Sequence, residues 1–430
     1  MHTPISPSQA SSKHPRPKYP SALEIATHAV ELLENDPLFN AGKGAVFTRD
    51  GINELEASVM VSRPSSYAKR GVGVTGLRRV RNPIRLARAV LEHGDEDLGA
   101  TSGGGYFRAQ DERENAVADE CHGGDLDVPS AQGHTLIHGP TAESLARKYG
   151  LELVDPAYFF TQKRWDEHVR ALARASTQRT LFARGIAATW SPDEYLPQGT
   201  VGAVALDRDG VLCAATSTGG MTNKLTGRIG DTPVVGAGFW AEGWEEQRRD
   251  YLATMPGAGS VVELGSALRA FLADCLPTPF LYTPVAQQQQ RLRRSPVISA
   301  ADADKPVTRT RATAISGTGN GDSFLRTAAA RTVGGVARWT GVSGAGALTR
   351  VAGPGGELQR SAGDRWGRSN EGEGGMIGIE VVAERDAETG RLVGGGKGVV
   401  VQDHNCRGMF RAWVDDGGVA RFKIWRDYDE

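Results

Sequence analysis

Residues 200–220, TVGAVALDRDGVLCAATSTGG, restrict the fold more than any other part of the sequence. Apolar residues stand on both sides of the pair Asp209-Gly210, and Asp-Gly between two apolar runs is typical of a tight β-hairpin turn. The positions that fit two buried strands are Val201, Ala203, Ala205 and Leu206 on one limb and Leu212, Ala214 and Thr216 on the other. Any fold of this chain must therefore contain a sheet that buries this hairpin.

The rest of the chain alternates between helical and strand patterns. Residues 21–42 carry apolar side chains at helical spacing, with Ser21 as the expected N-cap and Pro37 after the end. Further helices are expected over 82–93 (with Asn82 as the cap and Pro83 in the first turn), 140–150, 162–175 and 325–333. Strands are expected over 44–61, around a turn at Asp50-Gly51, and over 311–319 and 375–405. This alternation predicts an α+β layered domain.

Four stretches lack a sustained pattern. The polar residues 1–20 are expected to be a disordered lead-in. The other three are expected to be insertions, of which the second begins with charged, helix-like sequence: 94–133, 242–311 and 340–375. What remains is one domain in two parts, 21–199 and 200–430.

The composition argues against several classes of partner. The chain has 50 Lys+Arg against 51 Asp+Glu, and this balance disfavours nucleic acid or an anionic membrane bound by bulk charge. No apolar run approaches about 18 residues, so no membrane span is expected. The four cysteines, Cys121, Cys213, Cys275 and Cys406, form no CxxC pair. We interpret them as reduced thiols of a cytoplasmic protein, with two disulfides as the open alternative.

Thr200 is a candidate nucleophile because a glycine precedes it and a strand follows it. A threonine hydroxyl is a weak nucleophile near neutral pH and needs an adjacent base. Cleavage of the Gly199–Thr200 bond would free the amine of Thr200 to act as that base, and Gly199 permits the strained backbone that self-cleavage needs. Taken alone, the pattern fits an ordinary strand threonine equally well, so its surroundings decide.

Three features supply those surroundings. Thr218 stands on the opposite limb of the hairpin, in ATSTGG. Arg228 and Asp231, in GRIGD, would clamp the α-carboxylate and the α-amine of one amino acid, because an arginine fork binds a carboxylate and an aspartate binds an ammonium. Thr318 and Gly319, in SGTGNG, are candidate oxyanion donors at a glycine turn. Two of these features also have ordinary explanations. Arg228 and Asp231 could form a surface ion pair, and Thr318 and Gly319 could belong to a turn before a helix.

The segment GTVGAVALDRDGVLCAATSTGGMTNKLTGRIGDTPVVGAGFWA resembles the plant-type L-asparaginase/isoaspartyl peptidase family of N-terminal-nucleophile hydrolases. Other segments resemble the family in the same order: FNAGKGAVFTRDGINELEASVM, PAYFFTQKRW, AISGTGNGDSFLR and NCRGMFRAW. The resemblance implies a four-layer αββα sandwich with long insertions. It also implies hydrolysis of L-asparagine to L-aspartate and ammonia, of β-aspartyl dipeptides, or of both.

Carried over to this sequence, the resemblance gives each matching residue a role. Thr200 would begin a β-subunit, 200–430, after autocleavage from an α-subunit, 1–199, and Thr218 would assist its attack on the amide or isopeptide carbonyl. Asn40 would approach the nucleophile from the α-subunit. Thr318 and Gly319 would form the oxyanion hole, and the substrate site would contain Arg228, Asp231, Thr318, Gly319 and Gly321. The resemblance further implies a small-molecule or dipeptide substrate, no cofactor for catalysis and a homodimer of αβ units.

The turn LLENDPLFNAGK matches a family loop that holds sodium through main-chain carbonyls. Main-chain oxygens suit a hard cation. The carry-over names six residues as ligands: Leu33, Glu34, Asp36, Phe39, Ala41 and Lys43. Without the resemblance, the segment is a plain helix C-terminus before Pro37.

Two other functions stay open. A threonine aspartase-type protease cuts inside proteins, where no free α-amine exists, and Asp231 argues against it. A non-catalytic or maturation-impaired relative acting as a binding protein is the other, since the sequence enters the family pattern near the end of its first long helix and carries no His-Gly-Gly loop. For that start we expect either an N-terminally incomplete product or a divergent member. The presence of Thr200, Thr218 and Thr318 opposes a non-catalytic role.

Overall fold

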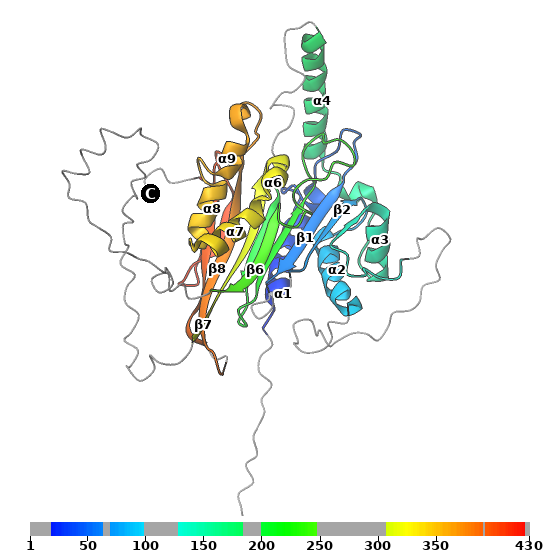
Figure 1. Ribbon diagram of the computed structural model, residues 1–430. Helices are drawn as coiled ribbons and strands as arrows, with labels where there is room; N and C mark the ends of the chain where they lie inside the picture. The colour runs from blue at the N-terminus through cyan, green and yellow to red at the C-terminus, as the bar shows by residue number, and fades with distance from the viewer. Residues whose placement is uncertain are drawn as a thin grey trace, which may run out of the picture.

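The computed structural model describes residues 19–62, 69–98, 128–183, 199–246, 307–389 and 392–425. They form two main β-sheets, a small two-stranded sheet, and helices packed on the main sheets (Figure 1). The expected lead-in lies almost wholly outside the described residues. The same holds for most of the first two expected insertions, since 99–127 and 247–306 are not described.

The first sheet joins strands from both sides of Thr200. Its order is β3-β2-β1-β5-β4, with β1 hydrogen-bonded antiparallel to both β2 and β5. Its strands are β1 (Leu55–Val61), β2 (Gly71–Leu77), β3 (Leu136–His138), β4 (Val201–Leu206) and β5 (Leu212–Thr218). The β1–β5 pairing is therefore the seam between the part before Thr200 and the part after it.

The second sheet is an antiparallel meander in the order β6-β7-β8-β9. Its strands are β6 (Phe239–Glu245), β7 (Val307–Gly319), β8 (Gly374–Asp386) and β9 (Leu392–His404). A separate hairpin follows, formed by β10 (Arg411–Val414) and β11 (Ala420–Lys423). Strands β4 and β5 contact β7, and β1 contacts β6, so the two main sheets face each other.

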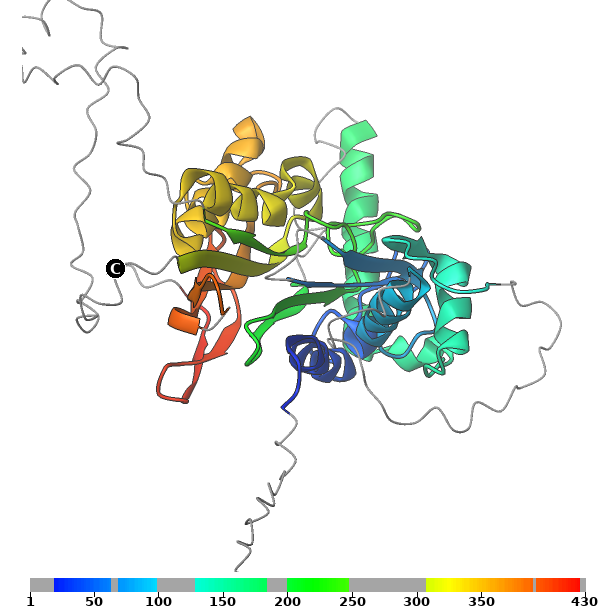
Figure 2. The same cartoon turned by 60° about the horizontal axis from the view of Figure 1, so that its bottom comes forward.

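Helices cover the outer side of each main sheet. On the first sheet lie α1 (Ala22–Asn35), α2 (Pro83–Asp97) and α3 (Gly139–Lys148). On the second sheet lie α7 (Ala329–Thr340) and α8 (Gly344–Ala352). Figure 2 shows the dark blue and yellow helices on opposite sides of the strands. The other helices are α4 (Gln162–Ala183), α6 (Gly321–Thr327) and α9 (Glu357–Ser361), with short 3-10 turns η1 (Gly42–Gly44), η2 (Pro156–Phe159) and η4 (Gly363–Arg365).

Strand β1 shows how the sequence fills the core on both sides of the first sheet. Successive strand side chains point to opposite faces. Ala57 and Val59 pack in the cluster beneath α1 and α2, whereas Met60 packs with Phe239 and Ile315 of the facing sheet. All seven residues of β1 are buried, including the polar Glu56 and Ser58, so neither face of the strand is exposed to solvent.

Two local predictions from the sequence are confirmed. The hairpin around Asp209-Gly210 forms, pairing Val201 with Ser217 at one end and Leu206 with Leu212 at the other. The helix after Ser21 begins with a full capping box, in which Ser21 accepts from the Glu24 N–H and the Glu24 side chain accepts from the Ser21 N–H. Such a cap stabilises a helix start by about 1 kcal/mol.

Three other local predictions were wrong. Residues 242–246 are not helix-like, since β6 runs to Glu245 and pairs with β7. The stretch 340–375 was expected to lack pattern, yet it contains α8 and α9, with Ala347, Leu348 and Val351 buried against the second sheet. Only one strand forms within 44–61, although the turn at Asp50-Gly51 is present. In each case contacts with distant segments decided the local conformation.

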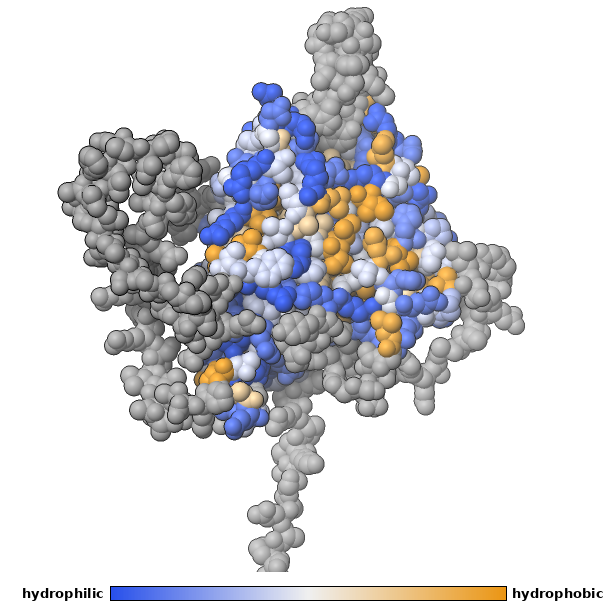
Figure 3. All heavy atoms as spheres, in the orientation of Figure 1, coloured by the Kyte–Doolittle hydropathy of each residue, from blue (hydrophilic) through white to orange (hydrophobic). Residues whose placement is uncertain are grey.

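Apolar residues are not confined to the core. Figure 3, in the orientation of Figure 1, shows them gathered near the middle of the visible face, with polar residues around them. In the described part of the chain no helix combines the length and apolarity that a membrane span requires. Two of the four cysteines, Cys213 and Cys406, lie in the described part of the chain, and both are free thiols there.

Candidate active site

Thr200 lies at the start of β4, half-buried, where three strands end together. The pairing of Val201 with Ser217, continued by one residue, puts Thr200 opposite Thr218 on the same face of the sheet. The backbone N–H of Thr200 donates to Thr318 Oγ1 at 2.9 Å. The structure thus brings together three threonines that are 18 and 100 residues apart in the sequence.

Thr218 is buried and begins a tight glycine turn. Its Oγ1 accepts a hydrogen bond from the Gly220 N–H at 3.1 Å, and Gly220 has a φ of +83°. Gly219 is required here, because a Cβ at this position would stand 2.7 Å from Asn40 Oδ1. The two glycines after the threonine are therefore the signal of a close approach between the chain segments before and after residue 200.

Asn40 makes that approach from the first part of the chain. Its Nδ2 donates to the Gly220 carbonyl at 2.7 Å, and its Oδ1 accepts from the Val46 N–H at 3.0 Å. Its own carbonyl accepts from the Gly219 N–H at 3.1 Å. Asn40 therefore binds the turn that follows Thr218.

Thr318 and Gly319 end β7, beside Gly374 and Gly375 of β8. Gly319 has a φ of +153°, and a Cβ there would overlap the carbonyl oxygen of Glu373. The chain then turns into α6, whose first turn is capped by Asn320 Oδ1 accepting from the Ser323 N–H at 3.0 Å. This glycine-dependent turn follows directly on Thr318, whose side-chain hydroxyl lies at the start of β4.

Arg228, Asp231 and Gly321 converge a few residues further along. A Cβ on Gly321 would lie 2.7 Å from Asp231 Oδ1 and 2.9 Å from an Arg228 guanidinium nitrogen. A side chain at Gly321 would clash with both charged groups, so glycine at this position is what lets them pack so closely against the chain. Because only two residues lie between Thr318 and Gly321, one short segment touches both Thr200 and the charged pair.

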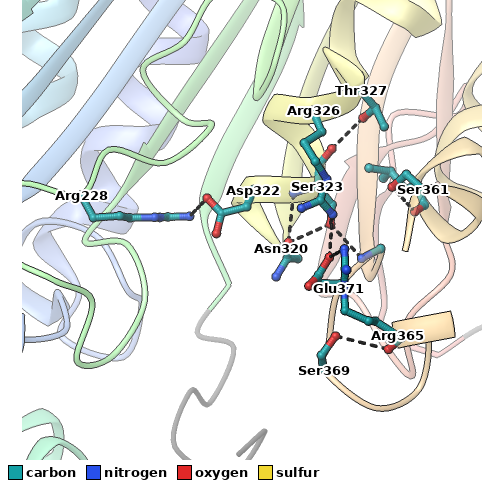
Figure 4. Close-up of polar contacts among 12 residues, drawn as sticks. Arg228, Asn320, Asp322, Ser323, Arg326, Thr327, Ser361, Arg365, Ser369 and Glu371 are labelled. Atoms are coloured by element: carbon teal, nitrogen blue, oxygen red, sulfur yellow. Dashed lines mark hydrogen bonds and ion pairs between the residues drawn. The ribbon is translucent and has the colours of Figure 1, made fainter. Parts of the chain in front are cut away.

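Asp322 is a member of this group that the sequence analysis missed. Its Oδ1 accepts from an Arg228 guanidinium nitrogen at 3.0 Å, and Figure 4 shows Arg228 extended toward it. An acidic residue in the first turn of a helix is ordinarily explained by the helix dipole, so the sequence offered no reason to single it out. The Asp322 carboxylate therefore holds the Arg228 guanidinium, which is the group that an incoming carboxylate would use.

Asp231 is the most perturbed acid of this site. Burial raises its pKa to about 7, while its own backbone amide and Arg228 act in the opposite direction and Glu56 and Asp322 add to the rise. Its Oδ2 has no hydrogen-bond partner among the described residues. A buried carboxylate without a full set of donors is destabilised as an anion. Asp231 Oδ1 is the oxygen that lies against Gly321, and a cationic donor that reached this carboxylate would favour its ionised form.

The loop 33–43 curls so that carbonyl groups lie close to two glycines. A Cβ on Gly42 would overlap the Glu34 carbonyl oxygen, and one on Gly44 would overlap that of Phe39. Three of the six expected ligand oxygens, those of Leu33, Asp36 and Ala41, already accept backbone N–H groups. A carbonyl oxygen has a second lone pair, so these bonds are compatible with a cation. Among the described residues no cluster of three or more His, Cys, Asp or Glu side chains is placed to hold a metal.

Glu34 belongs to that loop but its side chain turns inward. The carboxylate accepts from Ser217 Oγ at 2.6 Å, from the Ile84 N–H at 3.0 Å and from Asn82 Nδ2 at 3.2 Å. Asn82 stands at the N-cap position of α2 but makes no side-chain cap, and the Ile84 N–H in the first turn donates to Glu34 Oε1 instead. Burial raises the pKa of Glu34 to about 8 in spite of these three donors.

Comparison with known proteins gives a consistent result. The model of a family described as "Asparaginase" matches residues 18–117 and 127–244, just over half of the chain. A protein from Dictyostelium discoideum named "Putative isoaspartyl peptidase/L-asparaginase" is 36% identical over 242 residues, which cover 51% of this chain and 58% of that protein.

Two further relatives show the spread of names. The "Isoaspartyl peptidase" of Escherichia coli (strain K12) is 40% identical over 221 residues, 51% of this chain and 54% of its own length. The "Plant-type L-asparaginase" of Pyrococcus furiosus is 32% identical over 228 residues, 51% of this chain and 58% of its own length. The chain spans somewhat more than half the length of these relatives.

Proposed function

The chain belongs to the asparaginase family, and from that premise we propose that it is an autoprocessing threonine amidohydrolase. Its substrates would be L-asparagine, β-aspartyl dipeptides, or both, as the names of its relatives suggest. The observation that carries the proposal is the segment from Thr318 to Gly321. Thr318, at one end, accepts a hydrogen bond from the Thr200 N–H. Gly321, at the other end, lies against Arg228 and Asp231.

The first step is cleavage of the Gly199–Thr200 bond, which turns the amide nitrogen of Thr200 into an amine. That amine takes the proton of the Thr200 hydroxyl as its oxygen attacks the side-chain carbonyl of the substrate. Backbone donors at Thr318 and Gly319 stabilise the oxyanion. The amine then protonates the leaving ammonia or peptide amine, and water hydrolyses the ester on Thr200. Thr218, opposite Thr200, assists these proton transfers.

Substrate recognition falls to the charged pair. Arg228 binds the α-carboxylate as a fork, and Asp231 accepts from the α-ammonium. Because Asp322 already bonds Arg228 at 3.0 Å, the incoming carboxylate must share the guanidinium with it or displace it. The ammonium supplies a donor to the buried Asp231, which favours an amino acid or a dipeptide with a free α-amine over an internal site in a protein.

The first experiment is a denaturing gel. We expect purified protein to resolve into two pieces split between residues 199 and 200, and Thr200→Ala to stay in one piece. The mature protein should release aspartate from β-Asp-Leu and from L-asparagine, whereas Thr200→Ala should release none. A wild-type chain that stays intact and inactive on both substrates would contradict the proposal and favour a non-catalytic relative.

Further features belong to the same proposal. We infer that the two facing sheets with their outer helices are the four-layer αββα sandwich of N-terminal-nucleophile hydrolases. We also infer a structural sodium ion on the loop 33–43, a homodimer of αβ units and a cytoplasmic location. The apolar region in Figure 3 supports a subunit contact, since contiguous apolar surface commonly marks an interaction site.

A further inference from the structure

The loop that carries Arg228 and Asp231 is held by side chains from another part of the chain. Three residues at and just before the start of β1, two positions apart, bond its backbone. Glu54 Oε2 accepts from the Gly227 N–H at 2.8 Å, Glu56 Oε1 accepts from the Gly230 N–H at 3.3 Å, and Ser58 Oγ donates to the Thr232 carbonyl at 2.6 Å. The period of two puts all three on one face of the strand.

Glu56 combines the carboxylate of Glu54 with the complete burial of Ser58. It is fully buried, and the β1–β5 register puts it directly opposite Thr218. Its Oε1 also accepts from Thr75 Oγ1 at 3.1 Å and faces Lys224 Nζ at 3.9 Å. Its Oε2 has no hydrogen-bond partner in the described part of the chain. Glu56 therefore stands between the threonine cluster and the charged pair with part of its capacity to accept unused.

The charges around Asp231 leave a deficit of cations. Asp231, Glu56 and Asp322 are three acids, whereas Arg228 and Lys224 are the two nearby bases. Arg228 is engaged by Asp322, and Lys224 Nζ also donates to the Glu54 carbonyl at 3.3 Å. A group with more carboxylates than bases attracts a further cation, and Asp231 lies directly against Gly321.

We propose that Glu56 is a positioning residue of the ammonium subsite. From β1 it fixes the loop at Gly230, and its buried charge beside Asp231 gives the site its preference for substrates that carry a free α-amine. This inference rests on the proposed function, since it concerns the same pocket. Glu56 acts through the loop and through Asp231, because its free oxygen is buried inside the protein rather than exposed to the pocket.

The test compares two amides that differ in the α-amine alone, L-asparagine and succinamate. We expect Glu56→Gln to mature into two pieces as the wild type does, and to lose about tenfold in kcat/KM on L-asparagine. The same variant should change by less than about twofold on succinamate, which presents no ammonium. Removal of the Glu56 charge should also move the acidic limb of the L-asparagine pH profile to lower pH. The groups acting on Asp231 there are Arg228, Glu56 and Asp322.

Two variants serve as controls. Ser58→Ala removes an uncharged anchor of the same loop and should change both substrates by the same factor. Glu56→Asp keeps the charge and should keep the ratio between the two substrates near that of the wild type. Should Glu56→Gln fail to fold, a fall of that ratio in Glu56→Asp would overturn the inference.

The outcomes separate the inference from the proposed function. If Glu56→Gln lost kcat/KM equally on both substrates, Glu56 would merely hold the loop. If kcat/KM stayed at the wild-type value on both, Glu56 would have no role. Either result overturns the inference. A wild type that neither matures nor hydrolyses either amide would instead overturn the proposed function.

Discussion

Two buried acids in different regions of this molecule face the same desolvation but have different surroundings. Glu34, beneath the first sheet, receives three donors from α2 and β5. Asp231, beside Gly321, has one oxygen without a partner in the described part of the chain. Burial raises the pKa of both, to about 8 and about 7. A raised pKa alone therefore does not separate the two acids, whereas the number of hydrogen-bond donors that reach each carboxylate does.

The largest effect should come from removing the charge at the second of these acids. We expect Asp231→Asn to lower kcat/KM on L-asparagine on the order of 100-fold, because a buried charged contact to a ligand is worth about 2–5 kcal/mol. Steady-state kinetics of the matured variant measure this. Glu34→Gln is the matched control and should retain most of the activity. Similar losses in the two variants would break the distinction drawn between the two regions.

The pH dependence of activity sharpens the comparison. Since the ammonium needs an ionised Asp231, kcat/KM on L-asparagine should fall below about pH 7, by about tenfold per pH unit. The free amine of Thr200 titrates in a similar range, at a pKa of about 7.7–8.0. Succinamate has no ammonium, so its kcat/KM should not depend on the ionisation of Asp231. Its pH profile should show only the acidic limb that comes from the amine of Thr200. Identical acidic limbs for the two amides would contradict the role of Asp231.

The smallest effect concerns stability and involves Glu34. Its folded-state pKa is raised above 4.5, so the folded protein holds a proton that the unfolded chain releases as the pH rises. The stability from this group is therefore full below about pH 4.5, declines up to about pH 8 and then levels off. Glu34→Gln removes this decline. We expect it to be more stable than the wild type by about 2 kcal/mol at pH 8, with a smaller difference at pH 5.

Thermal unfolding of the wild type and of Glu34→Gln at pH 8 and pH 5 measures the effect of the substitution on stability. The value is set below the full linkage energy, because a glutamine amide has one accepting oxygen and cannot serve all three donors of the Glu34 carboxylate. Parallel pH dependences of the two melting temperatures would show that Glu34 is not the group that titrates.

The parts of the fold that were predicted correctly are those specified by neighbouring residues. Asp209-Gly210 sets the β4–β5 turn, and Ser21 with Glu24 sets the start of α1, because each signal acts within four residues. The helices α8 and α9 were missed because α8 has glycines at its first and third positions and α9 has only five residues, so neither has a strong helical preference of its own. Burial of Leu348 and Val351 against the second sheet stabilises them instead.

The same division holds for the candidate site. The glycines beside Thr218 and Gly321 mark places where backbone or charged groups approach closely, and such glycines are visible in a sequence. Glu56 and Asp322 were missed, since nothing in ELEASV or GNGDSF tells which distant loop they meet. Their partners Gly230 and Arg228 lie far away in the sequence, and only the pairing of β1 with β5 and the placement of α6 bring them together.

The position of β1 between β2 and β5 has a consequence for the matured protein. The seam runs from Glu56 opposite Thr218 to Val61 opposite Cys213, so the central sheet is shared by both products of a cut at residue 199. The two pieces would then be a heterodimer that shares one sheet, and neither piece would keep a complete sheet if they separated. Dissociation of the two pieces and their unfolding would then be a single event. Dilution would therefore lower the stability of the processed protein but not that of the uncut chain.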